Sequence, residues 1–129
     1  MDLKITFPGG KKVDADFGAF HVHTDQPVAS GGDGSAPAPF DLFLASLGTC
    51  AGLYVLGFCR ARSIPTEGLE LHEVADFDPE THRLVRVGIE IRVPPEFPDK
   101  YLGAVRAVAE KCAVKRALFD PPELVVTTA

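Results

Sequence analysis

Three cysteines, Cys50, Cys59 and Cys112, are the residues of this 129-residue chain best suited to chemistry. A cysteine thiolate is a nucleophile, and hydroperoxides oxidise it to a sulfenic acid that condenses with a second thiol to a disulfide. Three thiols are too few, and of the wrong parity, for the disulfide framework of a small secreted protein. They also have a plain structural interpretation, because free cysteine often packs as a small apolar side chain.

The spacing of the cysteines limits which of them can pair. Cys50 and Cys59 lie nine residues apart in one predicted helix, on opposite faces and about 13 Å apart along its axis. A disulfide needs Cα atoms within about 7 Å of each other, so this pair is excluded. Any pair within the chain therefore includes Cys112. Cys50 is its favoured partner, because the Cys59 end of the helix runs into the charged Arg60 and Arg62.

Two histidines and a glycine-rich loop are candidate binding sites for a metal and a nucleotide, respectively. His21 and His23 share one face of a predicted strand and would offer two metal ligands. No Cys-x-x-Cys or His-x-x-x-His spacing completes them, so we expect no metal. The glycines of the loop at residues 26–39 are not followed by Lys-Ser or Lys-Thr, so we expect no nucleotide cofactor.

The elements that position the cysteines follow from the apolar pattern, which predicts an α+β fold in a single domain over residues 1–129. Alternating apolar residues broken by Gly and Pro predict antiparallel strands at 3–7, 13–17, 20–23, 69–74, 85–93 and 124–127. Helical periodicity predicts helices at 39–62 and 98–111, with Cys112 directly after the second.

The first helix contains an uncharged run of 18 residues, from Leu42 to Cys59. That length is at the lower limit for a membrane span, but the run holds three glycines with Ser46 and Thr49 inside a β-patterned chain. We therefore expect a helix buried on nearly all sides and no membrane partner. Gly48 and Gly52 leave one face smooth enough for another backbone to approach. Because one small domain cannot easily cover this helix, we expect two chains around a shared core.

The charge balance and the N-terminal sequence bear on the partners and the cellular location that we expect. The chain has 13 Lys and Arg against 18 Asp and Glu, with no basic stripe, so we expect no nucleic acid partner. The N-terminus shows no positively charged region followed by an apolar one, which favours a cytoplasmic protein with reduced thiols.

Two motifs resemble those of the OsmC/Ohr family (osmotically induced protein C and organic hydroperoxide resistance proteins). Gly31-Gly32-Asp33-Gly34 followed by PFDLFLASLGTC at 39–50 resembles the first, and Glu110-Lys111-Cys112-Ala113-Val114 resembles the second. The resemblance implies an intertwined homodimer with antiparallel sheets packed around a buried central helix. It also implies a Cys-based thiol peroxidase that reduces organic hydroperoxides. Cys50 would be the peroxidatic and Cys112 the resolving cysteine, joined in an intramolecular disulfide that a thiol or dithiol reductant reopens.

The chain departs from the family pattern at the groups that activate the thiol. Asp41 stands where the family has a glutamate, and no arginine precedes Arg60, so the family's N-terminal arginine is missing. A reactive thiolate needs a nearby positive charge, so another cation would have to replace this arginine. The candidates are His21 or His23, Lys115 or Arg116, and a cation of the partner chain. Without a replacement, the alternative is a non-catalytic dimer that binds an apolar small molecule in the cavity around Cys50.

Overall fold

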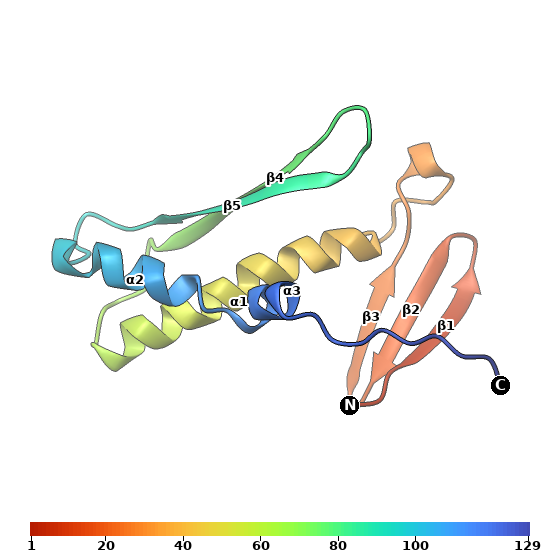
Figure 1. Cartoon of the computed structure of the whole chain (residues 1–129), viewed down its shortest axis with the longest axis horizontal. Coiled ribbons are helices and arrows are strands. Elements are labelled where there is room, and N and C mark those ends of the chain that lie inside the picture. The colour runs from red at the N-terminus through yellow and green to blue at the C-terminus, as the bar shows by residue number, and fades with distance from the viewer. The chain divides into compact units, whose positions relative to one another are not determined.

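A computed structural model describes all 129 residues and confirms the expected α+β fold. The chain forms two compact units, Met1–Ala45 and Ser46–Ala129 (Figure 1). That the whole chain acts as one domain stays a prediction.

The first unit is built on a three-stranded antiparallel meander. Its strands are β1 (Lys4–Gly9), β2 (Lys12–Phe17) and β3 (Phe20–Thr24), in the order β1-β2-β3. A two-residue turn joins β2 to β3, and Gly18 in that turn has a φ of 58°. Glycine adopts this left-handed conformation without the steric cost that other residues bear. The three strands expected from the alternation are confirmed.

Helix α1 (Pro39–Ala61) begins and ends where its sequence favours a boundary. Proline at the first helical position loses no hydrogen bond, since that N–H has no partner in a helix. The carboxylate of Asp41 accepts a hydrogen bond from the Ala38 N–H at 2.9 Å and carries negative charge near the helix N-terminus. After the helix, Ser63 turns the chain with a φ of 55°, two residues before Pro65.

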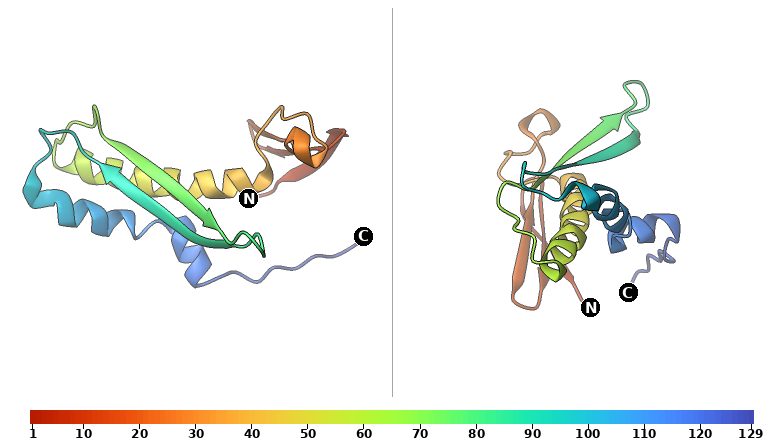
Figure 2. Two further views of the ribbon diagram at one scale, coloured as in Figure 1. Left: turned by 90° about the horizontal axis from the view of Figure 1, so that it is seen from above. Right: turned by 90° about the vertical axis from the view of Figure 1, so that its left-hand side faces the viewer.

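The second unit contains an antiparallel hairpin of β4 (Glu70–Phe77) and β5 (Leu84–Arg92). Asp78 organises its turn, where the carboxylate accepts hydrogen bonds from the N–H groups of Glu80 at 2.9 Å and Thr81 at 2.8 Å. The hairpin extends along α1 (Figures 1 and 2). This hairpin is the one that the alternation predicts.

The core of the second unit lies between α1, the hairpin and α2 (Leu102–Ala109), which the short 3-10 helix η2 (Asp99–Tyr101) precedes. The expected helix at 98–111 is confirmed, shortened at both ends. Buried residues of α1 and α2, together with one residue from each of two connecting segments, form one cluster, against which partly buried hairpin residues pack. Its fully buried members fix α1 against α2. The cluster consists of Val55, Phe58, Cys59, Ile64, Phe97 and Val105.

Near the C-terminus, one element was not predicted and one expected strand is wrong. Residues 113–119 form a further helix, α3 (Ala113–Phe119), which the short apolar pattern did not reveal. The strand expected at 124–127 is not formed, and no helix or strand follows α3. A strand needs a neighbouring edge to satisfy its backbone groups, and this segment pairs with no strand of its own chain. Leu124 and Val126 are accordingly exposed.

Helix α1 is only partly covered within one chain. Leu47, Ala51, Val55, Phe58 and Cys59 are buried, whereas Leu53 is 64% exposed. By length and composition alone the helix is apolar enough to cross a membrane, and 28% of its apolar window is buried here. A second chain that covers the remaining face stays a prediction.

Candidate redox site

The structure brings Cys50 and Cys112 together, although 61 residues separate them in the sequence. Cys50 lies in the middle of α1, and Cys112 lies at the start of α3, with their side chains in hydrogen-bond contact. Both are free thiols in this structure. Cys50 is partly exposed, whereas Cys112 is 2% exposed. A hydroperoxide therefore reaches Cys50 more easily than Cys112.

Cys112 serves as the N-cap of α3. Its backbone is extended, with φ −60° and ψ 145°, and its Sγ accepts a hydrogen bond from the Lys115 N–H at 3.3 Å. The sulfur thus fills the place that a serine or aspartate oxygen usually takes at a helix start. This local role fixes the direction of the Cys112 side chain.

The surroundings of Cys50 favour its thiolate. The pKa of Cys50 is lowered, first by the backbone N–H of Val114 and then by that of Ala113, by the Cys112 side chain and by the charge of Arg116. Partial burial opposes the shift, because it disfavours the charged form. The N–H groups lie in the first turn of α3, where they have no partner within the helix. Backbone N–H groups therefore lower the pKa of Cys50 more than the charge of Arg116 does, although the sequence led us to expect a cation in this role.

Arg116 is one of the cations considered as a replacement for the family's arginine, and it is the one whose charge lowers the pKa of Cys50. Its charge acts on Cys50, and its Nη2 donates a hydrogen bond to the Tyr54 hydroxyl at 3.3 Å. Lys115 contributes its backbone N–H to Cys112. Tyr54 was not foreseen, although its position four residues after Cys50 on α1 is the signal that would have placed it on the same helix face.

The two histidines belong to the meander of the first unit, where each has a carboxylate partner. His21 pairs with Asp16 across β2 and β3, and His23 pairs with Asp14 at 2.8 Å. Their expected role beside Cys50 stays a prediction. No group of three or more His, Cys, Asp or Glu side chains in the structure is arranged to hold a metal ion.

The remaining sequence candidates have local partners. Asp41 binds the Ala38 N–H at the start of α1, and the exposed Glu110 is the C-cap of α2. Their supporting roles in catalysis stay predictions. Cys59 is 0% exposed in the core, and burial raises its pKa, which favours a packing role over a reactive one.

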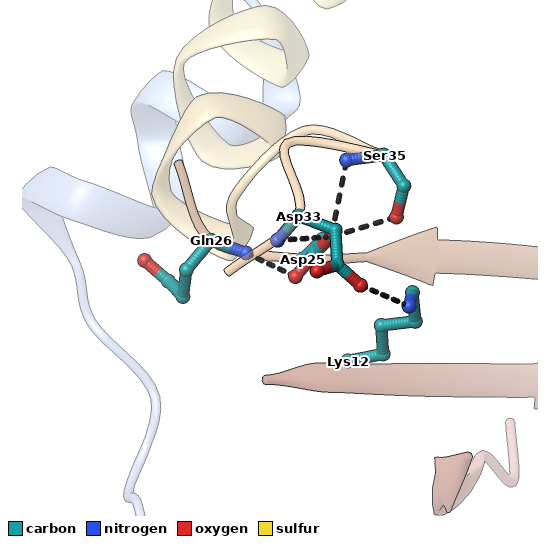
Figure 3. A network of polar contacts seen from close by, with 5 residues as sticks. All are labelled: Lys12, Asp25, Gln26, Asp33 and Ser35. Atoms are coloured by element: carbon teal, nitrogen blue, oxygen red, sulfur yellow. Dashed lines mark hydrogen bonds and ion pairs between the residues drawn. The ribbon is translucent and has the colours of Figure 1, made fainter. Parts of the chain in front are cut away.

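Asp25 organises the loop that carries the first motif, and sequence reasoning missed it. Its buried carboxylate accepts hydrogen bonds from the backbone of Gln26, Asp33 and Ser35 and from the Ser35 hydroxyl at 2.7 Å (Figure 3). These bonds, those from Ser35 foremost, lower its pKa to about 2. Asp33 also pairs with Lys12 at 2.7 Å. The loop is thus a defined structure rather than a flexible linker.

Gly32 is required in this loop for space. A Cβ at this position would meet the Gln26 carbonyl and lie 2.8 Å from Asp25 Oδ1. Part of the glycine-rich motif therefore serves loop geometry.

An open hollow of about 440 Å³ lies on α3. Two of its lining residues, Ala113 and Arg116, also act on Cys50. Ala117, Phe119 and Asp120 complete the lining. The hollow is therefore mixed in character, with apolar and charged side chains in its lining.

Solved structures with the same fold come from several bacteria. An osmotic stress-induced and detoxification response protein of Psychrobacter arcticus is 26% identical, with a TM-score of 0.77 over 89% of this chain and 85% of that one. An OsmC-like protein of Mycoplasma pneumoniae is 15% identical, with a TM-score of 0.70 over 93% and 87%. An organic hydroperoxide resistance protein of Vibrio cholerae, with captopril bound in one of its active sites, is 18% identical, with a TM-score of 0.63 over 92% and 84%.

The family assignment rests on the sequence profile as well as on the fold. No curated protein sequence matches the chain. The profile of a family described as OsmC-like protein matches residues 32–127, which include both motif cysteines, Cys50 and Cys112. The resemblance seen in those motifs is thereby confirmed, and the chain belongs to the OsmC-like protein family.

Proposed function

We propose that this protein is a Cys-based thiol peroxidase that reduces organic hydroperoxides, with Cys50 as the peroxidatic and Cys112 as the resolving cysteine. The observation that carries the proposal is the contact between a partly exposed Cys50, whose pKa is lowered, and the buried Cys112. Membership of the OsmC-like family supports it, as do structural neighbours named for organic hydroperoxide resistance.

The chemistry proceeds in three balanced steps. The Cys50 thiolate attacks the terminal oxygen of the hydroperoxide, the O–O bond breaks, and the alkoxide leaves and takes a proton to become an alcohol. Cys50 is then a sulfenic acid, which the Cys112 thiol attacks to form a disulfide and release water. Two equivalents of a thiol, or one dithiol, reduce the disulfide by exchange and restore both thiols.

Each cysteine environment suits one of these steps. The N–H groups of Val114 and Ala113 stabilise negative charge on Cys50 before the attack. Cys112 is held by the Lys115 N–H with its sulfur toward Cys50, so the second step needs little rearrangement. Its burial keeps the hydroperoxide from oxidising it first. The working unit is proposed to be a homodimer, because the exposed apolar face of α1 needs a cover.

The test is a thiol count after one equivalent of cumene hydroperoxide. We expect the loss of two thiols per chain in the wild-type protein and in Cys59→Ser, the matched control. Cys50→Ser should lose none, and Cys112→Ser should stop at a sulfenic acid on Cys50 that dimedone traps. Three unreacted thiols in the wild-type protein would refute the peroxidase and favour the alternative, a dimer that binds an apolar small molecule.

A further inference from the structure

Two matched pairs of residues face each other between α1 and α3. Cys50 and Tyr54 are four residues apart on α1, and Cys112 and Arg116 are four residues apart at the start of α3. Residues four apart lie on the same face of a helix, one turn from each other. Tyr54 and Arg116 differ by 62 in residue number, as do Cys50 and Cys112. Their hydrogen bond therefore lies one turn beyond the cysteine contact on both helices.

The Tyr54 contact restricts a side chain that would otherwise be mobile. Arg116 is exposed, and a long exposed arginine has many rotamers in which its charge lies in solvent. Tyrosine has only two side-chain torsions, so its hydroxyl is held at a nearly fixed point on α1. It accepts the Arg116 N–H at 3.3 Å on the side of α1 that carries Cys50.

We propose that Tyr54 is a positioning residue that holds the guanidinium of Arg116 beside the facing thiols of Cys50 and Cys112. Its catalytic consequence rests on the proposed peroxidase function, whereas the placement rests on the geometry alone. Tyr54 acts through Arg116, whose charge favours the thiolate of Cys50. A larger thiolate fraction at neutral pH means faster attack on the hydroperoxide.

The expected effects are modest because the pair is exposed. Exposed ion pairs change an equilibrium by at most about fivefold, which sets the upper limit for the effect of Arg116 on the thiolate fraction. Arg116→Gln should therefore slow the reaction of Cys50 by up to about fivefold below its pKa. Tyr54→Phe keeps the arginine charge and loses only its restraint, so we expect about twofold. Both effects should shrink in 1 M salt, where the screening length is about 3 Å.

The experiment measures the reactivity of Cys50 without any peroxide. The rate of alkylation by iodoacetamide is followed from pH 5 to 10 and read by mass spectrometry on the peptide that contains Cys50. The variants are Tyr54→Phe, Arg116→Gln and the double variant, which together form a double-mutant cycle. Matched controls are Tyr101→Phe, a hydroxyl deletion, and Arg106→Gln, a loss of exposed charge on α2, because neither residue is among the groups that act on Cys50.

The cycle has a defined outcome in each direction. A raised apparent pKa of Cys50 in Tyr54→Phe that disappears in the Arg116→Gln background supports the proposal. An unchanged pKa in Tyr54→Phe, or shifts that add in the double variant, overturns it. Arg116→Lys gives a second measurement, since it keeps the charge and should restore part of the rate.

The thiol count after cumene hydroperoxide separates this inference from the proposed function. If the wild-type protein loses two thiols while Tyr54→Phe leaves the pKa unchanged, the positioning role fails and the peroxidase stands. If no thiols are lost while Tyr54→Phe still raises the pKa, the peroxidase fails and the positioning role stands.

Discussion

A disulfide between Cys50 and Cys112 should stabilise the folded chain, by an amount that loop length and local contacts determine. The 62-residue span that it closes is worth about 4 kcal/mol of unfolded-chain entropy. Against this, the Cys112 sulfur caps α3 by accepting a hydrogen bond from the Lys115 N–H, and we expect oxidation of this sulfur to a disulfide to weaken the cap. Loss of a helix cap costs about 1 kcal/mol. We therefore expect the oxidised form to be more stable by about 3 kcal/mol.

The assay compares urea unfolding of the hydroperoxide-oxidised protein with that of the dithiothreitol-reduced protein. Equal protein concentrations are needed, because the stability of a dimer depends on concentration. A difference of about 3 kcal/mol moves the urea midpoint by at least about 1 M. The Cys59→Ser background excludes other pairings, and Cys112→Ala, which cannot form the bond, should show no redox dependence.

An oxidised form that is no more stable than the reduced form would refute this reasoning. It would mean that closing the disulfide distorts the start of α3 by more than the loop entropy supplies. The cap can be tested separately in the reduced state, where Cys112→Ser should preserve the stability of α3 better than Cys112→Ala. Equal stability of these two variants would contradict the capping role of the sulfur.

Three further predictions concern stability. Hydrogen bonds lower the pKa of Asp25 from 3.8 to about 2. Its carboxylate therefore stabilises the fold above pH 3.8, and this stabilisation is lost as the pH falls through 2. Acid unfolding followed by circular dichroism should be less steep in Asp25→Asn. Burial raises the pKa of Glu73 above 4.5, so the stability of the fold decreases as the pH rises through the folded-state pKa. Glu73→Gln should therefore have a higher melting temperature than the wild-type protein at pH 7 but not at pH 4. A lower melting temperature of Glu73→Gln at pH 7 would contradict this and would mean that a cation stabilises the carboxylate. A Cβ added at Gly57 in α1 would have no atom within 4 Å, so Gly57→Ala should stabilise the fold by about 1 kcal/mol. Gly32→Ala should destabilise the fold by about 1–3 kcal/mol, because its Cβ would clash with the Gln26 backbone. Urea titrations measure both effects, and the opposite order of stability would contradict the packing described.

The regular elements were largely predictable, because each is specified by residues close in sequence. Helix α1 follows from an uncharged run behind Pro39, and the β4–β5 hairpin follows from two alternating runs around Asp78. The two failures have separate causes. Helix α3 has only seven residues, too few for an apolar periodicity to show. The run at 124–127 has strand composition, but no strand edge of the chain pairs with it, and local pattern does not report such a pairing.

For the site, the sequence by itself singled out the residues that we propose carry the chemistry. Helix geometry excluded a Cys50–Cys59 pair, and the two motifs pointed to Cys50 and Cys112. Only the tertiary structure decided what lowers the pKa of Cys50, because the main contributors are the backbone N–H groups of Val114 and Ala113. Every residue except proline has such a group, so no residue type marks it. Its effect depends on where the chain folds, and that is information a sequence pattern does not hold.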